Sequence, residues 1–192
     1  MIKNPENVRR LRLMSGQLLH QSSSGHFLSD STWLDAHFEA CREEYECLLE
    51  WAPIEPGMSV LDAGCGAGSF LPGIRRKTGS KGRVFGLDFD AANCCIAQES
   101  YRDVSDGIAA GTVLTLPYRD GCFDAVWCAN TAQYFDEEGF CQLMCELSRV
   151  VRPGGVVVLK DVDMTGFRIL PAPELIGPHL AEAAITGPDV TA

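Results

Sequence analysis

The chain has 192 residues, of which 46% are hydrophobic, and this is enough for one domain with a substantial core. Its 26 acidic and 16 basic residues give a net charge of −10, which disfavours nucleic acid and anionic membrane surfaces as partners. With no apolar run long enough to span a bilayer, no apolar signal region and an odd count of nine cysteines, we expect a cytoplasmic protein with reduced thiols and no metal site.

Two helices are predicted in the N-terminal part. The first covers residues 4–16, with Asn4 as its cap and Pro5 in its first turn. The second begins near Ser31, carries apolar residues at spacings of three and four, and ends before Pro53. Residues 1–55 are therefore expected to form a helical segment that precedes the main domain.

From Met58 onward, short apolar runs alternate with glycine-rich turns and helical stretches, which is typical of βαβ units in a parallel sheet. Because crossovers are right-handed, helices should cover both faces and the carboxyl ends of the strands should share one ligand-binding edge. The core is expected over 56–165 and an irregular or short helical tail over 166–192. The predicted strands are 59–63, 84–87, 108–110, 123–128 and 156–162, and the predicted helices are 70–77, 91–101 and 137–150.

A glycine-rich loop follows the first of these strands. Gly64, Gly66 and Gly68 leave the backbone open to a ligand at the start of a helix, whose N–H groups are free. Asp88 ends the second strand, where a carboxylate can accept hydrogen bonds from both ribose hydroxyls. Loop and acid together predict a nucleoside site. The GxGxG spacing differs from the dinucleotide GxGxxG and lacks the GK[ST] of a P-loop, which disfavours an NAD-type oxidoreductase.

Four segments in order resemble class I S-adenosylmethionine-dependent methyltransferases of the ubiquinone/menaquinone-biosynthesis-like group (the type 11 methyltransferase domain). They are VLDAGCGAGSF, GLDFD, LPYRDGCFDAVWCAN and RVVRPGGVVVL, and they span about Met58 to Asp163. The resemblance implies a Rossmann-like, doubly wound α/β fold with a mostly parallel sheet in the order 3-2-1-4-5-7-6. It also implies an N-terminal helical lid over the site, to which His20, His26 and Tyr45 would belong.

The resemblance implies S-adenosyl-L-methionine as the cofactor. The three glycines would line its methionine and ribose portions, Asp62 would fix the loop or reach the amino group, and Asp88 would hold the ribose. Family members carry an acid after the third strand, whereas this chain has Gly111 followed by Thr112 and Val113. The full set of expected cofactor-binding residues is Asp62, Gly64, Cys65, Gly66, Gly68, Asp88, Phe89, Thr112, Val113 and Asn130.

The acceptor side is less defined, because methyl transfer depends mainly on alignment and exclusion of water, and a catalytic base is optional. The catalytic residues are unassigned, with Gln133, Tyr134 and His26 as candidates. Gln133 and Tyr134 follow the fourth strand, where they would either orient an acceptor or only cap the next helix. The turn of Pro153, Gly154 and Gly155 into the fifth strand is expected to be structural.

The predicted function is methylation of a small-molecule acceptor (EC 2.1.1.-). The alternative is a non-catalytic module, derived from a truncated methyltransferase fold, that binds the cofactor or a partner. Strands six and seven are expected to be missing, since no strand-like apolar run follows the fifth strand. Its exposed edge would then pair with a second copy in a homodimer or with a partner chain.

Overall fold

The computed structural model describes residues 13–14, 17–18 and 30–161. Within them, the main sheet has five strands in the order β5-β4-β3-β6-β7, and every neighbouring pair is parallel. In sequence terms this is 3-2-1-4-5, as expected for the Rossmann-like fold. The strands are β3 (Ser59–Ala63), β4 (Arg83–Asp88), β5 (Gly107–Ala110), β6 (Phe123–Ala129) and β7 (Val151–Lys160).

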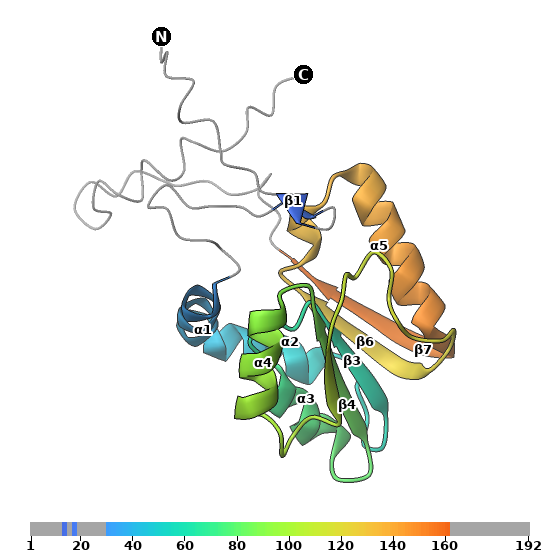
Figure 1. Ribbon diagram of the computed structural model, residues 1–192. Helices are drawn as coiled ribbons and strands as arrows, with labels where there is room; N and C mark the ends of the chain where they lie inside the picture. The colour runs from blue at the N-terminus through green and yellow to red at the C-terminus, as the bar shows by residue number, and fades with distance from the viewer. Residues whose placement is uncertain (1–12, 15–16, 19–29, 162–192) are drawn as a thin grey trace, which may run out of the picture. The chain divides into compact units, whose positions relative to one another are not determined.

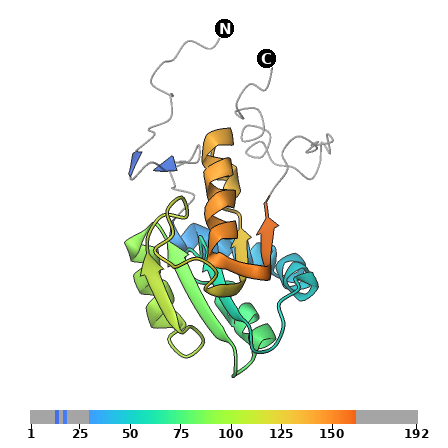
Figure 2. The same cartoon turned by 90° about the vertical axis from the view of Figure 1, so that its right-hand side faces the viewer.

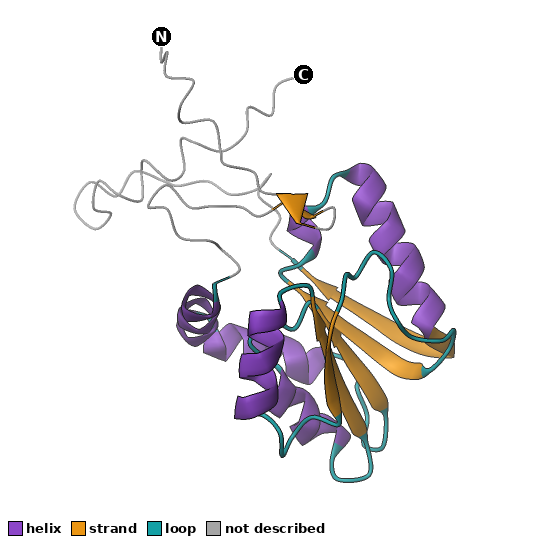
Figure 3. Ribbon diagram, in the orientation of Figure 1, coloured by secondary structure: helices purple, strands orange, loops and turns teal. Residues whose placement is uncertain are grey.

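Helices cover both faces of this sheet, as predicted. Figures 1 and 2 show α5 on one face and α3 and α4 on the other. Figure 3 shows the strands as one twisted layer between them. The helices are α1 (Ser31–Ala40), α2 (Arg42–Trp51), α3 (Leu71–Thr78), α4 (Ala91–Ser100) and α5 (Glu137–Val150), with a short 3-10 helix, η2 (Ala132–Tyr134).

Two apolar clusters hold these layers together. On the α5 side, Leu143 and Leu147 pack with Leu61 of β3, and on the other side Leu71 and Ile74 of α3 pack beneath the same sheet. All five side chains are fully buried. Burying a leucine or isoleucine side chain contributes roughly 1.5–3 kcal/mol, so both helices are fixed firmly to the sheet. The carboxyl ends of the strands are thereby held along one edge.

The predicted single helix from Ser31 to Pro53 is two helices. Its beginning is confirmed, with Asp30 capping the N–H of Thr32, but Cys41 leaves the helical region at φ −111° and ψ 16°. The chain therefore bends between α1 and α2.

The predicted helix over 4–16 is wrong at Leu13–Met14. These residues form β1, which pairs antiparallel with β2 (Gln17–Leu18). The remainder of that range lies outside the described residues, as do His20, His26 and Asp163.

The fifth strand of the sheet also begins earlier than predicted. It starts at Val151, and the expected turn at Pro153, Gly154 and Gly155 lies inside β7, where the pairing with β6 shifts register between Phe123 and Ala125. Gly154 has φ +79°, so this irregularity is a bulge in the strand.

β7 is an edge strand among the described residues, since β6 is its sole neighbour in the sheet. No sixth or seventh strand joins the sheet within residues 30–161. The expected cover from a second copy or a partner chain stays a prediction, as do the boundaries 1–55, 56–165 and 166–192. In the described part of the chain, no helix has the length and apolar character needed to cross a membrane.

Candidate functional site

The glycine-rich loop leaves β3 at Ala63 and enters α3 at Leu71. Gly64, Gly66 and Gly68 all have positive φ, at +83°, +53° and +94°. Residues with a Cβ rarely adopt this conformation, so the sequence of alternating glycines is what permits the loop. The N–H groups of Gly64 and Cys65 both donate to the carbonyl of Leu87, at 2.7 and 2.9 Å, which fixes the loop against the end of β4.

Other parts of the chain pack closely on the glycines. A Cβ on Gly64 would collide with Thr131, and one on Gly68 would meet Tyr101, Leu71 and Ala97. A Cβ on Gly66 would lie 2.8 Å from Cδ1 of Leu34 in α1. Gly68 is therefore required for helix packing, while Gly66 is buried beneath Leu34 of α1.

Asp88 joins the loop to the end of β4. Its side chain is 6% exposed, and its two oxygens accept hydrogen bonds from the backbone N–H groups of Gly66 and Asp90, both at 2.9 Å. Burial raises the pKa of the Asp88 carboxyl, while these two N–H groups act in the opposite direction. The side chain of Asn93 also hydrogen bonds to this carboxyl, so of its about four acceptor positions one remains for a ligand such as a ribose hydroxyl.

Asp62 is buried beneath the loop. It is 1% exposed, and Oδ2 has no hydrogen-bond partner among the described residues. Burial raises its pKa to about 8, and the negative charge of Asp88 adds to the rise. A buried acceptor without a partner is costly, so a ligand that brings a donor or a positive charge would be stabilised here.

The remaining expected cofactor residues lie around the same edge. Cys65 is buried and its Sγ donates to the carbonyl of Gly66 at 3.6 Å. Oγ1 of Thr112 accepts from the N–H of Leu114 at 3.2 Å, so this hydroxyl caps the turn after β5. Val113 is buried in the core, and its side chain therefore contacts apolar neighbours. Phe89 is half-buried directly after β4.

Asn130 follows β6 in a strained conformation, with φ +54°. Its backbone N–H donates to the carbonyl of Lys160 at 2.8 Å, and its Nδ2 donates to Oη of Tyr45 at 3.1 Å. Asn130 therefore connects β6, β7 and α2 at the carboxyl edge. A positive φ is uncommon for residues other than glycine. It indicates that contacts with the surrounding structure keep the backbone in this conformation.

The two described acceptor-side candidates lie next to Asn130. The Nε2 of Gln133 donates to the carbonyl of Asn130 at 3.1 Å, and its backbone N–H donates to Oδ2 of Asp161 at 3.0 Å. Burial raises the pKa of Tyr134 to about 12. The cap of α5 is Asp136, which accepts from the N–H of Gly139 at 2.9 Å, so neither candidate is needed as a helix cap.

Lys160 and His37 also reach this edge, and neither was among the site residues predicted from the sequence. Lys160 is the last residue of β7, and His37 belongs to α1. The available signal for Lys160 was its place at the end of the apolar run Val156 to Leu159, on the edge where ligands bind.

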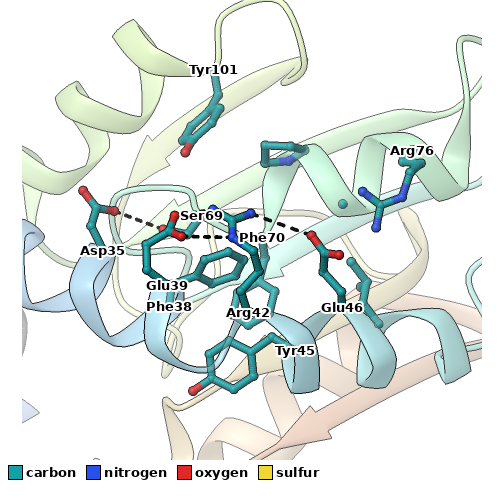
Figure 4. Close-up of a pocket in the computed structure, with 13 residues that line it drawn as sticks. Asp35, Phe38, Glu39, Arg42, Tyr45, Glu46, Ser69, Phe70, Arg76 and Tyr101 are labelled. Carbon is teal, nitrogen blue, oxygen red and sulfur yellow. Dashed lines mark hydrogen bonds and ion pairs between the residues drawn. The ribbon is translucent and has the colours of Figure 1, made fainter.

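A cavity of about 490 Å³ lies between α1, α2 and the start of α3 (Figure 4). At its rim, Ser69 donates to Asp35 at 3.2 Å, and Arg42 pairs with Glu39 and Glu46. The cavity therefore borders the residues that directly follow the glycine-rich loop. Its lining residues are Asp35, Phe38, Glu39, Arg42, Tyr45, Glu46, Leu49, Ser69, Phe70, Pro72, Gly73, Arg76 and Tyr101.

Residues 61–159 match the family model described as "Methyltransferase domain". The chain is 33% identical over 141 residues to "Methyltransferase GfsG" of Streptomyces halstedii, covering 71% of this chain and 49% of that protein. It is 28% identical over 121 residues to the demethylmenaquinone methyltransferase of Bacillus mycoides, covering 60% and 50%. The chain thus spans about half the length of these curated relatives.

The fold also resembles a solved structure, a SAM dependent methyltransferase from Aquifex aeolicus. The TM-score is 0.62 at 23% identity, and the match covers 81% of this chain and 85% of that one.

Proposed function

The chain belongs to the methyltransferase domain family, in the ubiquinone/menaquinone-like group of class I S-adenosylmethionine-dependent methyltransferases, and on this basis we propose that it methylates a small-molecule acceptor. The observation that carries the proposal is the meeting of the glycine-rich loop, Asp62 and Asp88 at the carboxyl edge of β3 and β4. These are the parts that a nucleoside with a charged amino acid tail requires.

The residues at this edge fit S-adenosylmethionine, the cofactor of this group. Its ammonium group would supply the donor that the buried Oδ2 of Asp62 lacks among the described residues. A ribose hydroxyl would use the remaining acceptor position of Asp88. Phe89 would cover the adenine, and the backbone near Thr112 and Val113 would take the place of the acid found in other members.

The bound cofactor supplies an electrophilic methyl group on a positively charged sulfur. What this chain contributes is alignment and exclusion of water. The glycine-rich loop is fixed through Leu87, and Asn130 is fixed through Lys160 and Tyr45, so both sides of the reacting centre have rigid support. Leu34 covers Gly66 and would shield the site from solvent.

A small acceptor is favoured by the net charge of −10, which would repel a phosphate backbone.

All nine cysteines are free, which supports placement in a reducing compartment such as the cytoplasm. The alternative is a module that binds the cofactor without turnover, and the coverage of only about half of the curated relatives is the observation that supports it.

Calorimetric titration with S-adenosylmethionine and S-adenosylhomocysteine tests the proposal. We expect micromolar binding that Asp88→Ala weakens about tenfold or more, because hydrogen bonds to a charged group are lost. Asp103→Ala, which removes an exposed carboxylate away from the loop, is the matched control and should bind like the wild type. A folded wild-type protein that binds neither compound would refute the cofactor site.

Turnover is tested separately from binding, with a screen of small hydroxylated and amino compounds monitored by release of S-adenosylhomocysteine. Transfer to any of them would establish the enzyme. Tight binding with no transfer across the screen would favour the non-catalytic alternative.

A further inference from the structure

Three polar side chains from separate parts of the chain meet at the hydroxyl of Tyr45: His37 of α1, Asn130 after β6 and Lys160 of β7. Its Oη lies 3.1 Å from Nδ1 of His37, accepts from Nδ2 of Asn130 at 3.1 Å, and accepts from Nζ of Lys160 at 3.4 Å. Lys160 also donates to Oδ1 of Asn130, and Nζ lies 4.6 Å from the centroid of the Tyr45 ring. We call these four residues the Tyr45 cluster.

The hydrogen-bond pattern favours one protonation state of His37. With Asn130 and Lys160 both donating to Oη of Tyr45, the hydrogen of the phenol is left for Nδ1 of His37. His37 is then neutral, with its proton on Nε2. Burial and the nearby charge of Lys160 lower the pKa of His37, which agrees with this assignment.

Lys160 is a half-buried amine whose protein partners are all neutral. Within residues 30–161, no ion pair joins it to a carboxylate, and two of its three N–H positions are used by Asn130 and Tyr45. Burial lowers the pKa of Lys160, while the charges of Asp161 and Cys41 oppose the shift. The charge of Asp161 offsets the burial of this half-buried cation only in part, and no direct ion pair with Lys160 is present within residues 30–161, so an anionic oxygen would be stabilised beside it.

The Tyr45 cluster adjoins the glycine-rich loop. Thr131, the residue after Asn130, occupies the space that a Cβ on Gly64 would need. Figure 4 shows the ring of Tyr45 at the wall of the cavity, with its hydroxyl directed away from the cavity. The cluster therefore lies beside the loop, and the acidic rim of that cavity is on the other side of the ring.

We propose that Lys160 is the catalytic base of the acceptor site, and that the acceptor carries an acidic oxygen: a phenol, an enol or a carboxylic acid. The assignment rests on the proposed methyl transfer. Lys160 first releases a proton to water, which its burial favours, and the resulting neutral amine takes the proton of the acceptor as the O–H bond breaks. The acceptor oxygen, or the carbon conjugated with it in an enol, then forms the new bond to the methyl group as the S–CH3 bond breaks. The proton remains on Nζ until it passes to water.

Tyr45, Asn130 and His37 act as positioning residues. Tyr45 and Asn130 hold Nζ of Lys160 at the edge of the sheet, and His37 fixes the hydrogen of the Tyr45 phenol. The titratable and charged groups that face Lys160 are His37 from α1, Cys41 from the bend, Tyr45 from α2 and Asp161 from its own strand end.

The test uses 4-nitrophenol, whose ionised form is yellow, at a pH below the pKa of the free compound. We expect the wild-type protein to bind and ionise the probe, and Lys160→Met to lower the affinity for the ionised form about tenfold or more. Lys81→Met, an exposed lysine in the turn before β4, is the matched control and should stay within about twofold of the wild type. Absence of ionised probe on the wild type, or its retention by Lys160→Met, would overturn the proposal.

A second measurement uses only the wild-type protein, so it remains valid if Lys160→Met does not fold. In the wild-type protein, 4-nitrophenol should slow acetylation of Lys160 and leave Lys81 unchanged, as followed by peptide mass spectrometry. Equal acetylation of Lys160 with and without the probe would contradict the assignment.

Titration of the same samples with S-adenosylhomocysteine separates this inference from the proposed function. If S-adenosylhomocysteine binds but the probe is not ionised, the proposed acceptor site is refuted and the cofactor site is retained. If Lys160 ionises the probe but S-adenosylhomocysteine does not bind, the proposed methyl transfer is refuted and Lys160 is part of an anion-binding site only.

Discussion

The carboxylate of Asp88 accepts a hydrogen bond from the backbone N–H of Gly66 across 2.9 Å, between the end of one strand and the loop that follows its neighbour. The loop therefore depends on a glycine for its conformation and on an acid twenty-two residues later for its position. A change at either residue should affect both stability and cofactor affinity.

Gly66→Ala is expected to lower the free energy of unfolding by about 1–2 kcal/mol, because alanine is strained at φ +53°. The added methyl group would also press on Leu34, and we expect binding of S-adenosylhomocysteine to weaken about tenfold. Urea unfolding and calorimetry measure the two effects. Gly57→Ala is the control, since Gly57 has φ +90° with open space around it and precedes β3 at the opposite edge of the sheet. It should lose stability but keep its affinity, and equal loss of affinity in both variants would argue against a loop effect.

Asp62→Asn is expected to flatten the dependence of stability on pH. The folded-state pKa of Asp62 is raised to about 8 from 3.8, so between these values the folded chain holds a proton that the unfolded chain releases. Stability should fall as pH rises through this window, by up to about 1.4 kcal/mol per pH unit. The difference in unfolding free energy between about pH 5 and pH 8 should be smaller in Asp62→Asn than in the wild type. Asp103→Asn should behave like the wild type, and a wild-type slope in Asp62→Asn would contradict the prediction.

His37→Gln tests a group whose effect on the pH dependence of stability is opposite to that of Asp62. The pKa of His37 is lowered by burial and by Lys160, so the unfolded chain takes up a proton first as the pH falls below about 6.5. The folded protein should therefore lose stability as pH drops through this range, and His37→Gln should lose less. Urea midpoints on either side of that pH check the prediction. Parallel curves for the two proteins would show that His37 is not the group that titrates.

Asp136→Ala is expected to cost about 1 kcal/mol, because the carboxylate caps α5 through the N–H of Gly139 at 2.9 Å. Binding of S-adenosylhomocysteine should be unchanged, since the cap lies outside the loop. Thermal unfolding measures the loss, and Asp103→Ala gives the background for removing a surface carboxylate. A fall in S-adenosylhomocysteine affinity would mean that α5 positions the cofactor site directly.

The sheet and its loop could be predicted because their signals are local. The run from Val60 to Ala63 is buried at every position, as its mostly apolar pattern predicts. The alternating glycines after it are typical of a loop with positive φ angles, and all three have them. The limits of α5 were predicted correctly because its apolar residues recur at helical spacing after a capping acid. The cofactor-binding roles assigned to residues around this loop stay predictions.

The parts that were predicted wrongly depend on distant contacts. The bend at Cys41 has no glycine or proline to mark it, and Tyr45 just beyond it packs against Phe38 and Phe70. The early start of β7 depends on pairing of Val151 with Phe123, on another strand. Lys160, His37 and Asn130 are far apart in sequence and become neighbours only after α1 and α2 pack against the sheet edge.

The contact of Leu34 with Gly66 has a consequence for the kinetics of binding. A ligand that approaches Gly66 from the side of Leu34 has to displace this leucine, and Leu34 lies on the same helix as His37, whose partner Tyr45 holds Lys160. Because α1 carries both Leu34 and His37, we expect association of such a ligand to include a step in which Leu34 moves away from Gly66, in addition to diffusion of the ligand.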